Sequence, residues 1–120
     1  IKTIEAPIEK VWNVLTDTLQ WPLWGPSVSE VNSIQQHISS GSRGQIRTVF
    51  GFWFSFEITR FEPLTYWGWR VAGISATGHR LRYIGPAQCE LIFEMPLLAF
   101  PYGFICRRAI NNIERLACQN

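Results

Sequence analysis

The sequence predicts an α+β domain in which an antiparallel sheet packs one apolar face against a long C-terminal helix. Two observations predict this class. Between residues 45 and 95, apolar and polar side chains alternate with a period of two, as in strands with one dry and one wet face. Residues 102–117 carry an apolar stripe with helical period. Each apolar surface is hidden from water only if it covers the other, so we expect the sheet to curve around this helix.

Composition fits a single domain that spans residues 1–120. Apolar residues make up 47% of the chain and charged residues 17%, which excludes a disordered chain. Six Trp and eight Phe suit both a core and the wall of a ligand cavity. The net charge of +2 is too small to indicate a nucleic-acid or membrane-surface role by itself. No apolar run is long enough to span a bilayer, so we expect no stable membrane insertion.

The titratable and sulfur-bearing residues predict neither a metal nor a cofactor. The three cysteines, Cys89, Cys106 and Cys118, are odd in number and form no CxxC pair, which argues against a disulfide framework and a zinc site. A reducing, cytoplasmic compartment is the simplest expectation. Two histidines and scattered carboxylates do not group as metal ligands, and no nucleotide-binding or nucleophile motif occurs.

The N-terminal part predicts a short strand over residues 1–5 and then a helix. Pro7 suits a first helical turn. The apolar stripe of this helix consists of Ile8, Val11, Trp12 and Leu15. Asp17 and the irregular segment 21–26 end the helix, with room for one further helical turn.

The middle of the chain predicts successive strands joined by short turns. The expected strands cover residues 28–38, with a bulge, and then 45–50, 52–61, 65–72, 79–84 and 87–95. Turn chemistry occupies 39–44 and 62–63, and residues 73–78 read as a loop. Short connections favour antiparallel pairing.

A set of short motifs then resembles a known family. The opening Ile4-Glu5-Ala6-Pro7-Ile8-Glu9-Lys10-Val11-Trp12 is similar to the AP-x-E-x-V-W start of the START-like superfamily, also called helix-grip or SRPBCC. Further motifs follow in the family's order: Trp21-Pro22-x-Trp24, Gly44, Phe61-Glu62-Pro63, Trp69-Arg70, His79 and Asn112-Ile113-Glu114-x-Leu116. The nearest branch is that of polyketide cyclase/dehydrase and lipid-transport-like proteins. The resemblance implies about seven strands gripping the last helix, with a cavity between them. It does not fix the chemistry, because the superfamily includes carriers, receptors, cyclases and chaperone activators.

The inward positions of the strands and the C-terminal helix predict the wall of that cavity. They are Phe52, Phe54, Phe56, Trp67, Trp69, Leu81, Tyr83, Leu91, Phe93, Tyr102, Cys106, Ile110 and Ile113. An ordinary filled core would use the same positions. By the resemblance, Trp21 and Trp24 would line the mouth of the cavity.

Four polar residues are candidates for chemistry: His79, Tyr83, Tyr102 and Arg70. The imidazole of His79 suits proton transfer near neutral pH, although a capped or rim histidine is the favoured interpretation. The two tyrosine hydroxyls are favoured as satisfied core groups. Alternation points Arg70 outward, which favours a surface salt bridge.

Three functions are consistent with these features. The first is binding of a small hydrophobic molecule that is lipid-, quinone- or polyketide-like, without a cofactor. The second is a cyclase or dehydratase that uses polar groups in the same cavity. The third is a protein-interaction module of the chaperone-activator kind, whose outer sheet face carries Trp53 and Tyr66.

Overall fold

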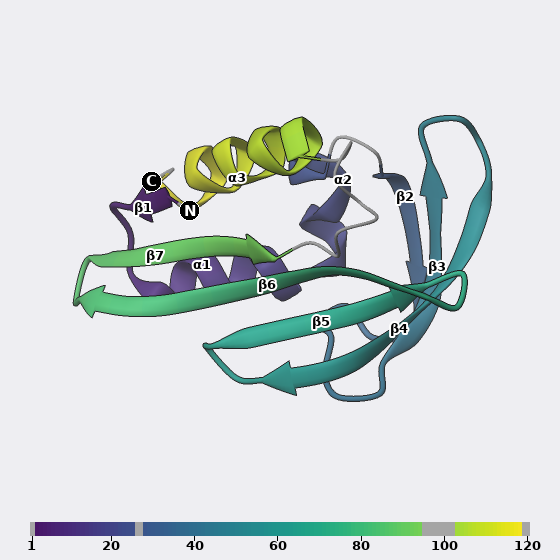
Figure 1. The fold of residues 1–120 in the computed structure, drawn as a ribbon, viewed down its shortest axis with the longest axis horizontal. Helices are drawn as coiled ribbons and strands as arrows, with labels where there is room; N and C mark the ends of the chain where they lie inside the picture. Colours follow the sequence, from purple (N-terminus) through teal and green to yellow (C-terminus); the bar gives the residue numbers. More distant parts are fainter. Residues whose placement is uncertain (1, 26–27, 95–102, 119–120) are drawn as a thin grey trace.

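A curved antiparallel sheet encloses the C-terminal helix, as Figure 1 shows for the computed structural model of the chain. The structure describes residues 2–25, 28–94 and 103–118, and for 103–106 the backbone only. The described elements are β1 (Lys2–Ile4), α1 (Ile8–Thr16), a 3₁₀ turn (Thr18–Gln20), α2 (Trp21–Trp24), β2 (Val28–Ser33), β3 (Arg43–Thr48), β4 (Trp53–Glu62), β5 (Tyr66–Val71), β6 (Ile74–Gly85), β7 (Gln88–Glu94) and α3 (Gly103–Ala117).

The strands of the described residues form one seven-stranded sheet in the order β1-β7-β6-β5-β4-β3-β2, in which every neighbouring pair is antiparallel. Consecutive strands from β2 to β7 are joined by hairpins, and β1 closes the far edge beside β7. Helix α3 packs on α1, α2 and β7 at the inner side (Figure 1). The helix-grip arrangement of an α+β domain is confirmed.

One hairpin differs from the prediction. Residues 74–78 belong to β6, although they read as a loop. Val71 pairs with Ile74, so only Ala72 and Gly73 form the turn, and both have positive φ, 53° and 77°. A turn with two positive φ values matches the twist of a hairpin but is unusual for alanine, so the sequence lacked the Asn-Gly or Asp-Gly signal that would have marked it.

The predicted strand 28–38 is shorter than expected. Strand β2 ends at Ser33, and His37 pairs separately with Asp17 through an isolated bridge. The expected bulge is present between Val28 and Glu30.

Over most of the sheet, the residues predicted to face inward are buried. At one end of the sheet they are not. Phe56 and Ile58 of β4 are 3% and 1% exposed, whereas Phe54, on the same face of the same strand, is 39% exposed. Phe54 lies where the described helices no longer cover the sheet. The dry face is therefore dry only in its central part.

This contrast gives a matched pair of substitutions on one strand. Phe56→Ala should lower the free energy of unfolding by about 3–5 kcal/mol, because it leaves a cavity in a packed core. Phe54→Ala should cost clearly less, because its ring is already in partial contact with water. Urea unfolding of both variants measures the difference, and equal losses would contradict the face assignment.

Candidate functional site

Trp67 lies at the centre of an aromatic cluster on the inner face of the sheet. Its ring stacks on Trp21 of α2 at 5.4 Å between centroids and 8° between planes. It also stacks on His79 of β6, at 3.9 Å and 24°. The remaining members of the cluster meet these rings edge-on or tilted: Trp24, Phe56, Trp69 and Phe93. Offset and edge-to-face contacts of this kind add to the stabilisation from buried area.

Two indoles of α2 are held by the end of α1. The Trp21 Nε1–H donates to the carbonyl of Leu15 at 2.9 Å, and the Trp24 Nε1–H donates to that of Val14 at 3.1 Å. The last carbonyls of a helix have no partner within the helix, so these bonds supply donors that would otherwise be missing. Trp21 and Trp24 are buried, at 2% and 6% exposure, and pack into the aromatic cluster.

His79 is the polar centre of the cluster, and its hydrogen bonds fix its tautomer. Nδ1 lies 3.2 Å from the carbonyl oxygen of Trp67, which can only accept, so Nδ1 carries the proton. Nε2 then accepts from the hydroxyl of Thr77 at 3.3 Å, and that oxygen accepts from the Trp69 indole N–H at 3.2 Å. Both ring nitrogens are thus occupied in the neutral state.

The environment of His79 disfavours its charged form. Burial among aromatic rings lowers the pKa of the imidazole from 6.5 to about 3, and the hydrogen bond to the Trp67 carbonyl opposes this only in part. At neutral pH the ring is uncharged and is a weak base. The side chain is 1% exposed, and both ring nitrogens are bonded, so of the favoured interpretations the structure agrees with a capped histidine and not with one at a rim.

The cluster contains one polar atom without a partner among the described residues. The Nε1–H of Trp67 is buried and donates to no acceptor. Leaving such a donor unpaired costs about 1–3 kcal/mol. Buried polar groups are nearly always paired, so this indole marks a place where a ligand oxygen could be recognised.

The structure brings most of the predicted cavity residues to the inner face. Phe56, Trp67, Leu81, Leu91, Ile110 and Ile113 are buried there, and Trp69 and Phe93 are half-buried. Tyr102 lies outside the described residues, and Cys106 belongs to α3 but its side chain is not described.

Three predicted wall residues are exposed, which corrects their inward placement. Phe52 precedes β4 in the turn after β3 and is 65% exposed, and Phe54 follows it at the uncovered end of the sheet. Tyr83 is 60% exposed, because β6 there extends beyond the last β5–β6 pair, Tyr66–Arg80. Neither a cavity role nor a catalytic role for Tyr83 is supported by this placement.

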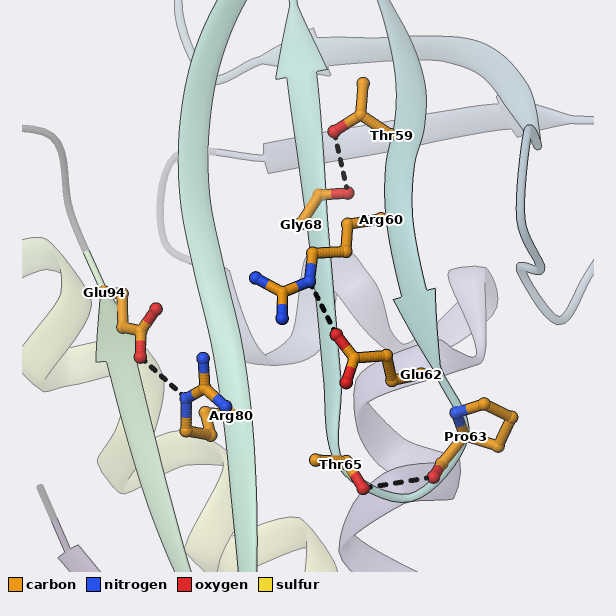
Figure 2. Close-up of polar contacts among 8 residues, drawn as sticks. All are labelled: Thr59, Arg60, Glu62, Pro63, Thr65, Gly68, Arg80 and Glu94. Atoms are coloured by element: carbon orange, nitrogen blue, oxygen red, sulfur yellow. Dashed lines mark hydrogen bonds and ion pairs between the residues drawn. The ribbon is translucent and has the colours of Figure 1, made fainter.

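Arg70 points to the outer face, which carries a ladder of charge pairs. Figure 2 shows two of them, Arg60–Glu62 at 2.6 Å and Arg80–Glu94 at 2.7 Å. The other pairs on this face are Arg43–Glu57, Arg47–Glu30 and Arg82–Glu90. Among the described residues each outward glutamate of the sheet has an arginine partner, and Arg70 is the arginine left over. The salt bridge expected for Arg70 is therefore not found in this part of the chain, but its outward direction is as predicted.

Beside Arg70 the outer face has a shallow groove of about 290 Å³. Its lining consists of Arg43, Ser55, Phe56, Glu57, Arg70 and Gly73. The Arg43–Glu57 pair partly neutralises this groove.

Other classes of site find no support in the part of the chain that the structure describes. No group of His, Cys, Asp or Glu side chains there could hold a metal ion. Burial raises the pKa of the Cys89 thiol, which therefore stays protonated and packs as a small apolar group. None of the described helices has the length and apolar character needed to cross a membrane.

The sequence from residue 2 to residue 93 matches the family model described as polyketide cyclase/dehydrase and lipid transport. The chain belongs to this family. The family lies within the START-like superfamily, so the resemblance carried by the short motifs is confirmed. A search of curated proteins finds no match.

Several solved structures share the fold. A hypothetical protein of Helicobacter pylori superposes with a TM-score of 0.76 at 12% identity, covering 97% of this chain and 84% of that one. Protein NE0264 of Nitrosomonas europaea gives 0.70 at 17% identity, with 97% and 90% covered. DynU16, a protein of the dynemicin biosynthetic locus, gives 0.68 at 16% identity, with 95% of this chain but only 44% of that chain covered. At these identities the likeness concerns the fold alone.

The buried neutral histidine predicts a pH-dependent stability. Below pH 6.5 the unfolded imidazole takes up a proton, whereas the folded ring stays neutral down to about pH 3. The free energy of unfolding should therefore fall as the pH drops through this range, by on the order of 1 kcal/mol per pH unit. Urea unfolding of the wild type and of His79→Gln, at several pH values, isolates this contribution.

The matched control is His37→Gln, which changes the exposed histidine bonded to Asn13 and keeps His79. This variant should retain the wild-type fall in stability. If His79→Gln also retains it, the buried imidazole is not the group that takes up the proton on unfolding.

Proposed function

We propose that the protein binds a small hydrophobic molecule between the inner face of the sheet and α3. The observation that carries the proposal is a wall of apolar side chains that the fold does not fully cover. Trp69, Val71 and Phe93, which we call the inner wall, are each half-buried. Their cross-strand partners Ile58, Phe56 and His79 are buried, so the inner wall adjoins the core directly.

The chemistry of the cluster favours a ligand with an acceptor oxygen. Contact with aromatic and aliphatic carbon would supply most of the affinity, at about 0.8 kcal/mol per buried CH₂ before association costs. The unpaired Trp67 Nε1–H would gain a partner from a carbonyl or ether oxygen. A quinone-like, polyketide-like or lipid molecule with a carbonyl group fits this description better than a pure hydrocarbon. The lipid-transport and cyclase members of the family support the same class of ligand.

A cyclase or dehydratase activity receives less support from the described residues. Proton transfer needs a group whose pKa lies near the working pH. His79 is held neutral with both nitrogens bonded, Tyr83 is 60% exposed, and Arg70 is exposed on the outer face. Tyr102, the fourth candidate, lies outside the described residues.

The chaperone-activator alternative loses one of its two outward residues, Tyr66, as a contact for a partner. The ring of Tyr66 lies against Gly68 and Gly78 of the outer face, where an added Cβ would meet it. Arg60 and Arg80 stack on this ring, with their guanidinium carbons 4.5 and 4.7 Å from its centroid. Tyr66 therefore completes the sheet surface and is not a free contact for a partner.

Binding of the neutral fluorescent probe 1-N-phenylnaphthylamine tests the proposal. Val71→Phe adds bulk at the inner wall and should weaken probe binding by about tenfold or more, since overpacking a site of this kind costs about 1–3 kcal/mol. Gln45→Phe adds a ring on the outer face, opposite Ser55, and should leave binding unchanged. Native mass spectrometry of freshly purified protein should also reveal a bound small molecule.

The proposal fails if the wild type neither binds the probe nor carries a co-purified molecule. Equal loss of binding in both variants would also contradict it, because the effect would then not arise at the inner wall.

A further inference from the structure

We propose that the turn between β3 and β4 docks the protein onto the surface of an anionic lipid bilayer. Residues 48–54, which we call the aromatic tip, expose five large apolar side chains. The exposed fractions are 57% for Val49, 83% for Phe50, 65% for Phe52, 44% for Trp53 and 39% for Phe54. Contiguous exposed apolar surface of this kind marks an interaction site rather than ordinary surface scatter.

The fold does not need these rings to close the turn. The Thr48 N–H donates to the carbonyl of Phe52, and the Gly51 N–H donates to that of Thr48, both at 2.9 Å. Gly51 has a φ of +91°, a conformation that glycine adopts without strain. Backbone bonds and one glycine thus shape the aromatic tip, and its side chains remain available for an external contact.

A second turn extends the apolar surface. The Ala72 N–H donates to the carbonyl of Ser55 at 2.8 Å, which places the β5–β6 turn beside the first part of β4. Ile74, directly after this turn, is 71% exposed. Neither segment 48–56 nor segment 71–78 contains a charged residue. The end of the sheet is therefore uncharged over two neighbouring hairpins.

Two arginines lie directly behind this uncharged end, of which only Arg70 lacks a carboxylate partner among the described residues. Arg47 precedes the aromatic tip, and its Nη2 lies 3.8 Å from where a Cβ of Gly51 would stand, while its Nη1 pairs with Glu30 at 3.1 Å. Arg70 lies just before the second turn and has no carboxylate partner among the described residues. An apolar end followed by an arginine that lacks a carboxylate partner in the described part of the chain fits an anionic bilayer, whose acyl region lies beneath a layer of phosphates.

The shape favours a bilayer over a protein partner. The aromatic tip projects at the end of the molecule opposite β1 and the end of α3 (Figure 1). A protein partner would need a pocket that fits a narrow projection, and stable protein interfaces bury about 800 Å² on each side. Lipids yield around such a projection, and Trp and Phe rings are favoured at the boundary of headgroups and acyl chains. This contact is peripheral and does not depend on the ligand proposed above.

Vesicle flotation tests the proposal with the full chain. The wild type should float with vesicles of phosphatidylcholine and phosphatidylglycerol, and less with phosphatidylcholine alone. The double variant Phe50→Ser/Phe52→Ser should bind at least about tenfold more weakly, since each ring loses its burial in lipid. The matched control, Leu19→Ser/Ile34→Ser, removes two side chains that are 70% and 100% exposed elsewhere and should bind like the wild type. Arg70→Gln should weaken binding to the anionic vesicles only.

A second readout follows the aromatic tip itself. Brominated lipids should quench the fluorescence of Trp53, and the quenching should largely disappear in Trp53→Phe. Unchanged 1-N-phenylnaphthylamine binding and circular dichroism would show that the double variant is folded. If the wild type binds no probe but still floats, the internal ligand site fails and the docking surface stands.

Three results would overturn the docking proposal. The first is a wild type that remains unbound with both kinds of vesicle. The second is a double variant that floats like the wild type. The third is a dimer in light scattering that the double variant abolishes, without vesicle binding, because the aromatic tip would then be a contact between two copies of the chain.

Discussion

The carbonyl end of α1 is the constraint on which the rest of the interior depends. Its last four carbonyls receive donors from four different places: Asn13 from the Asp17 N–H, Val14 and Leu15 from two indoles, and Thr16 from the Ile38 N–H. A buried helix end without such donors would be costly. Because the two indoles meet this need, the short helix α2 must lie across α1, and its rings must face the sheet.

This placement of α2 determines the surroundings of His79. Trp67 stacks on Trp21 of α2 and on the imidazole of His79. Asn112 of α3 donates to the carbonyl of Trp24 at 3.2 Å, so the C-terminal helix is tied to the same short segment. A histidine in this position is surrounded by the carbon atoms of aromatic rings, and one carbonyl and one hydroxyl are its hydrogen-bond partners. The neutral state of the imidazole follows from that environment. The site is therefore better suited to recognising a ligand than to moving a proton.

The sequence predicted the features that follow from local periodic patterns. It did not predict the features that depend on contacts between residues far apart in the chain. Alternation identified the inner faces of β4 to β7, and the helical stripe identified α3, because both patterns are local. The sequence did not predict that His79 lies in the interior of a strand. This position depends on the two-residue turn at Ala72–Gly73, which lets β6 begin at Ile74. The bonds from Trp21 and Trp24 were missed because they join an irregular segment to the helix before it. Phe54 was misplaced because alternation predicts which face of the sheet a side chain lies on. It does not predict whether another element packs over that part of the face.

Strand β4 links the two proposed surfaces. From the turn inward, the exposed fraction falls from 65% at Phe52 and 39% at Phe54 to 3% at Phe56 and 1% at Ile58. Phe56 packs against Trp21 and Trp69, so the series ends in the aromatic cluster. A hydrophobic molecule that leaves a bilayer loses least free energy along a path where apolar contact is never interrupted. Under the two proposals, the apolar side chains on the inner face of β4 would supply such a path from the aromatic tip to the inner wall. If both proposals hold, the exposed rings of the aromatic tip are the outer end of the surface that receives the ligand.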